Sequence, residues 1–83
     1  MQGTIELIGP HQSMVGVRTE NGTFSVLELV GGYSPEMGDV LSGALENLGG
    51  EEVLNITQGE TWDVFIQSIL ESKDSAWELV SQY

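Results

Sequence analysis

The hydrophobic positions of residues 1–57 fall in short runs rich in β-favouring residues, and the runs end at glycine, proline or asparagine turn signals. In the first run a period of two places Ile5 and Leu7 on one face of a strand and Glu6 on the other. Runs of this length and composition indicate strands. The pattern predicts five of them, over residues 3–8, 14–19, 24–30, 38–43 and 52–57.

The second and third predicted strands are separated by the sequence Glu-Asn-Gly-Thr, residues 20–23. Asn-Gly is the strongest short signal for a two-residue hairpin turn, because both residues tolerate the positive φ angles that this turn needs. We therefore predict a hairpin over residues 14–30, with Asn21 and Gly22 at its tip and both at positive φ.

The first part of residues 58–83 is compatible with either a strand or a helix. Trp62 to Ile66 is dense in β-formers and favours a sixth strand near residues 62–67. The hydrophobic residues between Trp62 and Val80 also fit the 3.6-residue spacing of a helix. Periodicity alone does not decide between strand and helix over 62–70, and the strand is our preferred interpretation.

A C-terminal helix is predicted for the end of the chain, over residues 74–83. Ser75 and Glu78 have the spacing of a capping box, which places the first residue at Asp74 or Ser75. We expect the apolar face of this helix to pack on the strands, and an exposed face that receives a partner is the alternative. The residues on that face are Ala76, Leu79, Val80 and Tyr83.

Five or six short strands at even spacing predict a mainly β protein, a small OB-like barrel with a C-terminal α-helix. Closure of the barrel removes sheet edges that a chain of 83 residues has little material to cover. This length fits a single domain. We expect the barrel to occupy residues 1–57, and residues 58–83 to form an extension that carries the sixth strand and the helix.

The charge of the chain excludes more functions than any motif does. Thirteen Asp and Glu stand against two basic residues, Arg18 and Lys73, which gives a net charge of −11. Nucleic acids and anionic membrane surfaces bind through Lys and Arg, so this charge disfavours both as partners. There is no cysteine for a disulfide or a thiolate metal site. The first residues lack a basic segment and a long apolar run, so we expect a cytoplasmic protein.

The sequence resembles a cold-shock-type OB-fold domain. The family pattern Lys-Gly-Thr-Val-Lys-Trp-Phe-Asn-Pro-x-Lys-Gly-Phe-Gly-Phe-Ile-x-x-x-x-Gly lies without gaps on residues 2–22, and it matches at Gly3, Thr4, Pro10 and Gly22. Later segments, residues 38–40 and 50–57, are similar to the family's Gly-x-x-Val and Gly-Pro-x-Ala-x-Asn-Val. The chain also resembles small bacterial proteins of uncharacterised function, a likeness that implies a fold and no activity.

The departures from this family concern its binding face. Cold-shock domains stack bases on aromatic rings over a basic surface, and each stacked base contributes about 1–3 kcal/mol. Here the family's basic positions hold Gln2, Glu6 and Gln12. The aromatic positions of the family's first three strands fall on Leu7-Ile8, Met14-Val15-Gly16 and Ser25-Val26-Leu27-Glu28. The resemblance therefore implies a barrel that has lost nucleic-acid binding.

No catalytic or metal-binding constellation is recognisable in the sequence. His11, the one histidine, stands in a predicted loop without a neighbouring partner that would orient it as a base. Glu46, Glu51 and Glu52 surround a glycine turn but lack the ligand spacing of a calcium loop. We therefore predict a protein that is not an enzyme and has no cofactor.

The leading hypothesis is a non-catalytic interaction or accessory domain whose partner is a protein. Two alternatives remain: residual binding of single-stranded RNA or DNA, and an acidic decoy that imitates nucleic acid for a basic protein. We expect Trp62 and Trp77 to pack in the core or between barrel and helix; on the surface they would mark an interface. The candidate interaction face consists of Leu7, Met14, Arg18, Glu28 and Tyr33.

Overall fold

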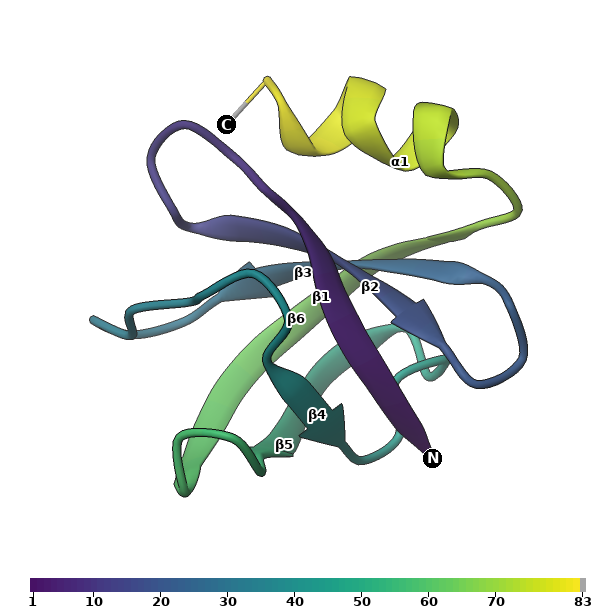
Figure 1. The fold of residues 1–83 in the computed structure, drawn as a ribbon. Helices are drawn as coiled ribbons and strands as arrows, with labels where there is room; N and C mark the ends of the chain where they lie inside the picture. The colour runs from purple at the N-terminus through teal and green to yellow at the C-terminus, as the bar shows by residue number, and fades with distance from the viewer. Residues whose placement is uncertain (83) are drawn as a thin grey trace.

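The computed structural model describes residues 1–82 and contains a closed antiparallel β-barrel with one helix outside it (Figure 1). Around the barrel the strands follow the order β1-β2-β3-β6-β5-β4, and every neighbouring pair is antiparallel. No helix within residues 1–82 has the length and apolarity that crossing a membrane requires. The elements are β1 (Gln2–Ile8), β2 (Met14–Thr19), β3 (Phe24–Leu29), β4 (Val40–Ser42), β5 (Gly49–Asn55), β6 (Glu60–Leu70) and α1 (Lys73–Val80).

The predicted fold class, a small OB-like barrel with a C-terminal helix, is confirmed, but one boundary is wrong. The barrel does not end at residue 57, because β6 pairs with β3 on one side and with β5 on the other. Residues 62–70 are therefore strand and not helix. The fifth strand also begins earlier than expected, at Gly49. Gly49 and Gly50, which were predicted to form a turn, are already paired with Ile66 and Phe65.

A β-bulge divides β1 into two halves that face different ways. Ile5 pairs with Val17 and Leu7 pairs with Gly16, so Glu6 is the extra residue. The bulge reverses the alternation. Ile5 therefore points into the barrel while Leu7 points outward, and the prediction that they share a face is wrong.

The β2–β3 hairpin forms as predicted, but its turn is of another type. The Gly22 amide donates to the Thr19 carbonyl, which puts Glu20 and Asn21 at the centre of the turn. Gly22 has a φ of 82°, whereas Asn21 is not at positive φ. This is the arrangement of a type I turn followed by a glycine in the left-handed region, and not of a two-residue turn.

The apolar residues form two separate cores because β2 and β3 are covered on both faces. The barrel interior contains Trp62, which is 0% exposed. The outer side of β2 and β3 is covered by α1, which lies across these strands in Figure 1. The interior core consists of Ile5, Val15, Val17, Leu27, Leu29, Leu41, Leu45, Val53, Trp62, Val64 and Ile66. The outer core consists of Leu7, Met14, Phe24, Val26, Ala76 and Val80.

The helix begins before the predicted capping box. Its N-cap is Ser72, whose hydroxyl accepts a hydrogen bond from the Ser75 amide at 3.1 Å. Ser75 is thus inside the helix, and the predicted start at Asp74 or Ser75 is wrong. Of the face predicted to pack on the strands, Ala76 and Val80 are buried, while Tyr83 lies outside the described residues.

Candidate interaction surface

Two of the five residues predicted to form an interaction face are buried. Leu7 and Met14 lie in the outer core beneath α1, where they are 9% and 3% exposed. A partner therefore has no access to them in this structure. The predicted face is not one continuous surface, because the sequence did not show that the helix covers this side of the sheet.

The third predicted residue, Arg18, is engaged by β1. Its guanidinium donates two hydrogen bonds to the carboxylate of Glu6, at 2.6 and 3.2 Å, and lies 4.8 Å from the centre of the Phe24 ring. Lys73 of α1 pairs with the same carboxylate at 3.3 Å. Both basic side chains of the chain thus converge on one carboxylate, and the other Asp and Glu residues have no Lys or Arg to pair with.

This arrangement shifts the acidity of Glu6. The hydrogen bonds from Arg18 lower the pKa of the Glu6 carboxyl, and the nearby Lys73 lowers it further. The same contact raises the pKa of Arg18. The three side chains tie α1 to β1 and β2, which gives them a structural role.

The fourth predicted residue, Tyr33, is also structural. Its ring stacks on Trp62, with centroids 5.2 Å apart and planes at 19°. Its hydroxyl accepts a hydrogen bond from the Asp63 amide at 3.0 Å. Tyr33 thus fastens the loop after β3 to the start of β6, and its ring is half-buried.

Glu28, the fifth predicted residue, is exposed and lies beside a groove that the sequence did not indicate. It pairs across β3 and β6 with Phe65 and accepts a hydrogen bond from the Gln67 amide side chain at 2.8 Å. Phe65 is 44% exposed, a large fraction for an aromatic ring in the middle of a sheet. Of the predicted face, Glu28 alone is paired with a residue that lines this groove.

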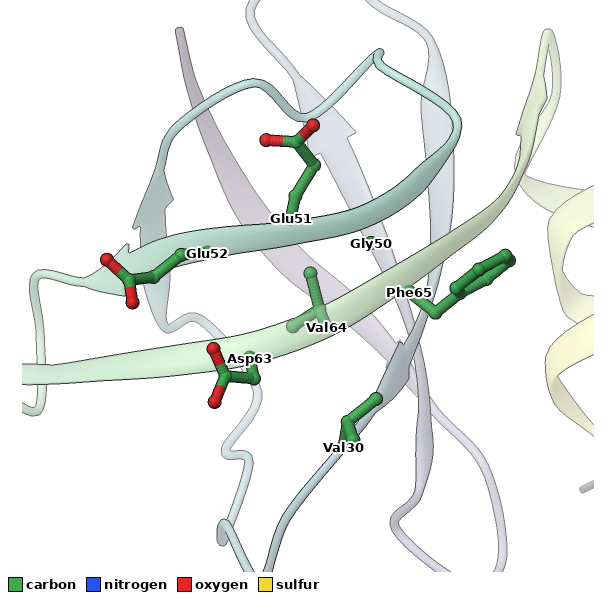
Figure 2. A pocket seen from close by; sticks show the side chains of 7 residues that line it. All are labelled: Val30, Gly50, Glu51, Glu52, Asp63, Val64 and Phe65. Carbon is green, nitrogen blue, oxygen red and sulfur yellow. The ribbon is translucent and has the colours of Figure 1, made fainter.

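This groove, which we call the β5–β6 groove, has a volume of about 450 Å³. It lies on the outer face where the two strands pair and where β3 ends. Figure 2 shows the side chains of Glu52 and Asp63 on neighbouring strands at one end of the groove, and the carboxylate of Glu51 pointing away from them. The groove is lined by Val30, Gly50, Glu51, Glu52, Asp63, Val64 and Phe65.

The strand register explains why these side chains gather. Gly50 is paired with Phe65, and Glu52 is paired with Asp63. Asp63 directs its backbone N–H and C=O toward Tyr33 and Val30, and so faces Glu52 in a non-hydrogen-bonded pair. Side chains are closest in such pairs, so Glu52 and Asp63 are direct cross-strand neighbours.

The sequence contained one usable sign of this groove. Trp62 and the apolar residues two and four positions later point into the barrel, so Asp63 and Phe65 between them must point outward. An aromatic residue on the outward face of a strand calls for an explanation. The hydrophobic spacing over residues 62–70 fits a helix as well as a strand, and only the strand turns Phe65 outward.

The three glutamates near the predicted glycine turn, Glu46, Glu51 and Glu52, do not form one cluster. Glu46 accepts hydrogen bonds from Thr23 and Asn21, which lower the pKa of its carboxyl. Glu51 accepts one from the Asn47 side chain, and Glu52 belongs to the groove. Within residues 1–82 no cluster of three or more acidic or histidine side chains is placed to hold a metal ion.

Comparison with known proteins adds no relative. No family model, curated protein or solved structure matches this chain with significance. The likeness to cold-shock domains therefore depends on the residues aligned above, and the functional argument depends on the geometry of this molecule.

Proposed function

We propose that this protein is a non-catalytic interaction domain, a cold-shock-like barrel that binds another protein in place of nucleic acid. Its partner carries a basic surface, because the exposed carboxylates of this chain are matched by almost no positive charge. The proposal that it is not an enzyme rests on the lack of a nucleophile–base pair in the sequence.

The observation that carries the proposal is the position of α1. OB-folds bind single strands on the face formed by their second and third strands. Here that face is the outer core, in which Ala76 and Val80 of the helix cover Met14 and Val26. A strand of nucleic acid would have to displace the helix before it could reach β2 and β3.

Electrostatics supports the same conclusion. A second cavity, of about 330 Å³, adjoins Arg18 and is the best remaining place for a phosphate. Its only basic side chain is held by Glu6, and Glu20 also lines it. A phosphate there would meet a neutralised arginine beside a carboxylate, so this cavity gives little support to the nucleic-acid alternative.

Affinity capture from the source cells, with and without nuclease, tests the proposal. We expect a captured protein whose yield does not change after nuclease treatment, and no enriched RNA or DNA. In parallel, fluorescence anisotropy with labelled 12-mer oligonucleotides should show no binding at physiological salt. Nuclease-sensitive capture, or salt-dependent oligonucleotide binding in the low micromolar range, would overturn the proposal. Capture of a nucleic-acid-binding protein that oligonucleotides displace would favour the decoy alternative.

A further inference from the structure

The β5–β6 groove contains a glycine whose side-chain position is empty. Gly50 lies inside β5, where the register with β6 is continuous, and its φ is not in the left-handed region. A Cβ atom built on Gly50 would have no heavy atom within 4 Å. Glycine weakens a strand, and it accompanies a bulge, a bend of the barrel or the close approach of a ligand or another chain. The continuous register excludes a bulge at Gly50.

Phe65 is exposed opposite this glycine and does not cover it. Aromatic rings sometimes stabilise a strand by lying over a glycine on the neighbouring strand. The empty space around the Gly50 Cβ position excludes that arrangement here. The ring of Phe65 is thus left 44% exposed beside an open space, where it offers apolar surface to a ligand.

The carboxylate pair at the other end of the groove is unfavourable in the isolated chain. Like charges directly opposite each other on neighbouring strands destabilise a sheet. Neither basic side chain relieves Glu52 and Asp63, because Arg18 and Lys73 both pair with Glu6. An empty strand position, an exposed ring and an uncompensated pair of carboxylates therefore line one groove, with the ring at one end and the carboxylates at the other (Figure 2).

We propose that the β5–β6 groove binds an arginine side chain presented by a segment of the partner protein. This inference rests on the proposed function as a protein-interaction domain. The methylene stem lies along Phe65 and the space above Gly50, and the guanidinium at its end donates to Glu52 and Asp63 at the other end of the groove (Figure 2). Arginine suits the site better than lysine because its planar cation presents several N–H donors to neighbouring carboxylates.

A second copy of this chain is a poor source of that arginine. Its Arg18 is held by Glu6 and by the Phe24 ring, and Lys73 closes the same ion pair. The groove therefore needs a cation from another protein. Its volume of about 450 Å³ suits one side chain with the backbone on either side of it.

The test is a titration of the ¹⁵N-labelled protein with three peptides, acetyl-Gly-Val-X-Val-Gly-amide, in which X is arginine, lysine or citrulline. We expect the arginine peptide to shift the amide resonances of Gly50, Glu52, Asp63 and Phe65 first. The lysine peptide should bind several-fold more weakly. The citrulline peptide, which has the same shape without the charge, should bind at least tenfold more weakly.

Variants separate the groove from general charge attraction. Gly50→Val fills the space above the strand without changing the charge. It should lower the affinity for the arginine peptide at least tenfold, while the melting temperature stays the same or rises. Glu52→Gln should weaken it three- to tenfold. The matched controls, Glu78→Gln and Trp77→Ala on α1, should leave binding unchanged.

Three results would overturn this inference. They are the lack of groove shifts at millimolar arginine peptide, equal binding of the arginine and citrulline peptides, and an undiminished affinity in Gly50→Val. Specific shifts confined to another surface would refute the groove and leave the interaction domain standing. Nuclease-sensitive capture in the experiment above would instead refute the interaction domain.

Discussion

Leu7 packs against Gly16 so closely that a Cβ atom on the glycine would lie 2.8 Å from the leucine Cδ1. The contact is possible because the bulge at Glu6 turns Leu7 outward onto β2. In the cold-shock pattern an aromatic residue falls at this glycine. The outer face is thus packed as a core, and it has no room for the ring that the pattern places there.

Gly16→Val should lower the free energy of unfolding by about 1–3 kcal/mol, because it overpacks the outer core. Urea denaturation followed by circular dichroism measures this. The control is Gly50→Val, which meets no atom within 4 Å and should not destabilise the protein. Leu7→Ala added to Gly16→Val should recover part of the loss, since the two residues are in contact. Equal effects of the two glycine substitutions would contradict the packing described here.

Removal of α1 should destabilise the barrel. A chain that ends at Ser72 loses the buried Ala76 and Val80 and exposes Leu7, Met14 and Phe24. At about 1.5–3 kcal/mol for each large apolar side chain fully buried, we expect a loss of about 3 kcal/mol or more. A shortened chain with an unchanged denaturation midpoint would show that the helix is an appendage.

The two tryptophans should differ sharply in their contribution to stability. Trp62 is completely buried and stacks on Tyr33, so Trp62→Ala should cost about 3–5 kcal/mol. Trp77 is 45% exposed on the helix, unlike the packed position expected for it, and Trp77→Ala should cost less, about 1 kcal/mol. Denaturation curves decide the matter, and similar losses for both would refute the assignment of Trp77 to the surface.

Acid should remove the stabilisation that Glu6 provides. Because its pKa is lowered in the folded protein, the unfolded chain binds more protons as the pH falls. The contribution is complete above the ordinary glutamate pKa of about 4.3, and is lost as the pH falls through the lower folded value. The stability difference between the wild type and Glu6→Gln should therefore be the same at all pH values from neutral down to about 4.3, and should shrink as the pH falls further. A difference of equal size at pH 7 and in strong acid would count against the ion pair.

The sequence predicted the strands because their ends carry strong turn signals, but it did not predict which way their residues face. Leu7 and Ile8 are both apolar, so either of them could face the barrel interior. Nothing in the sequence marks the bulge at Glu6 that decides between them. One signal was available for the outer core. Residues 14–17 and 24–27 are apolar or small on both faces, which is typical of strands covered on both sides.

The candidate site was less accessible to prediction than the fold. Its residues come from the end of β3 and from both partners of the β5–β6 pair, and they meet only through the register. The predicted face failed for a related reason. Leu7 and Met14 occupy aromatic positions of the family pattern, whereas their burial depends on a helix some sixty residues later in the chain, at Lys73–Val80.

The place of β6 in the ring has a consequence for how the chain folds during synthesis. Residues 1–57 emerge first with β3 and β5 each lacking a neighbour, since both pair with a strand that ends at Leu70. Until that strand is made, the nascent chain presents two open hydrogen-bonding edges, the feature through which incomplete β-proteins aggregate. Closure also joins segments far apart in sequence, which makes folding slow for a protein of this size. The growing chain therefore passes through an aggregation-prone interval in which a chaperone would be of most use.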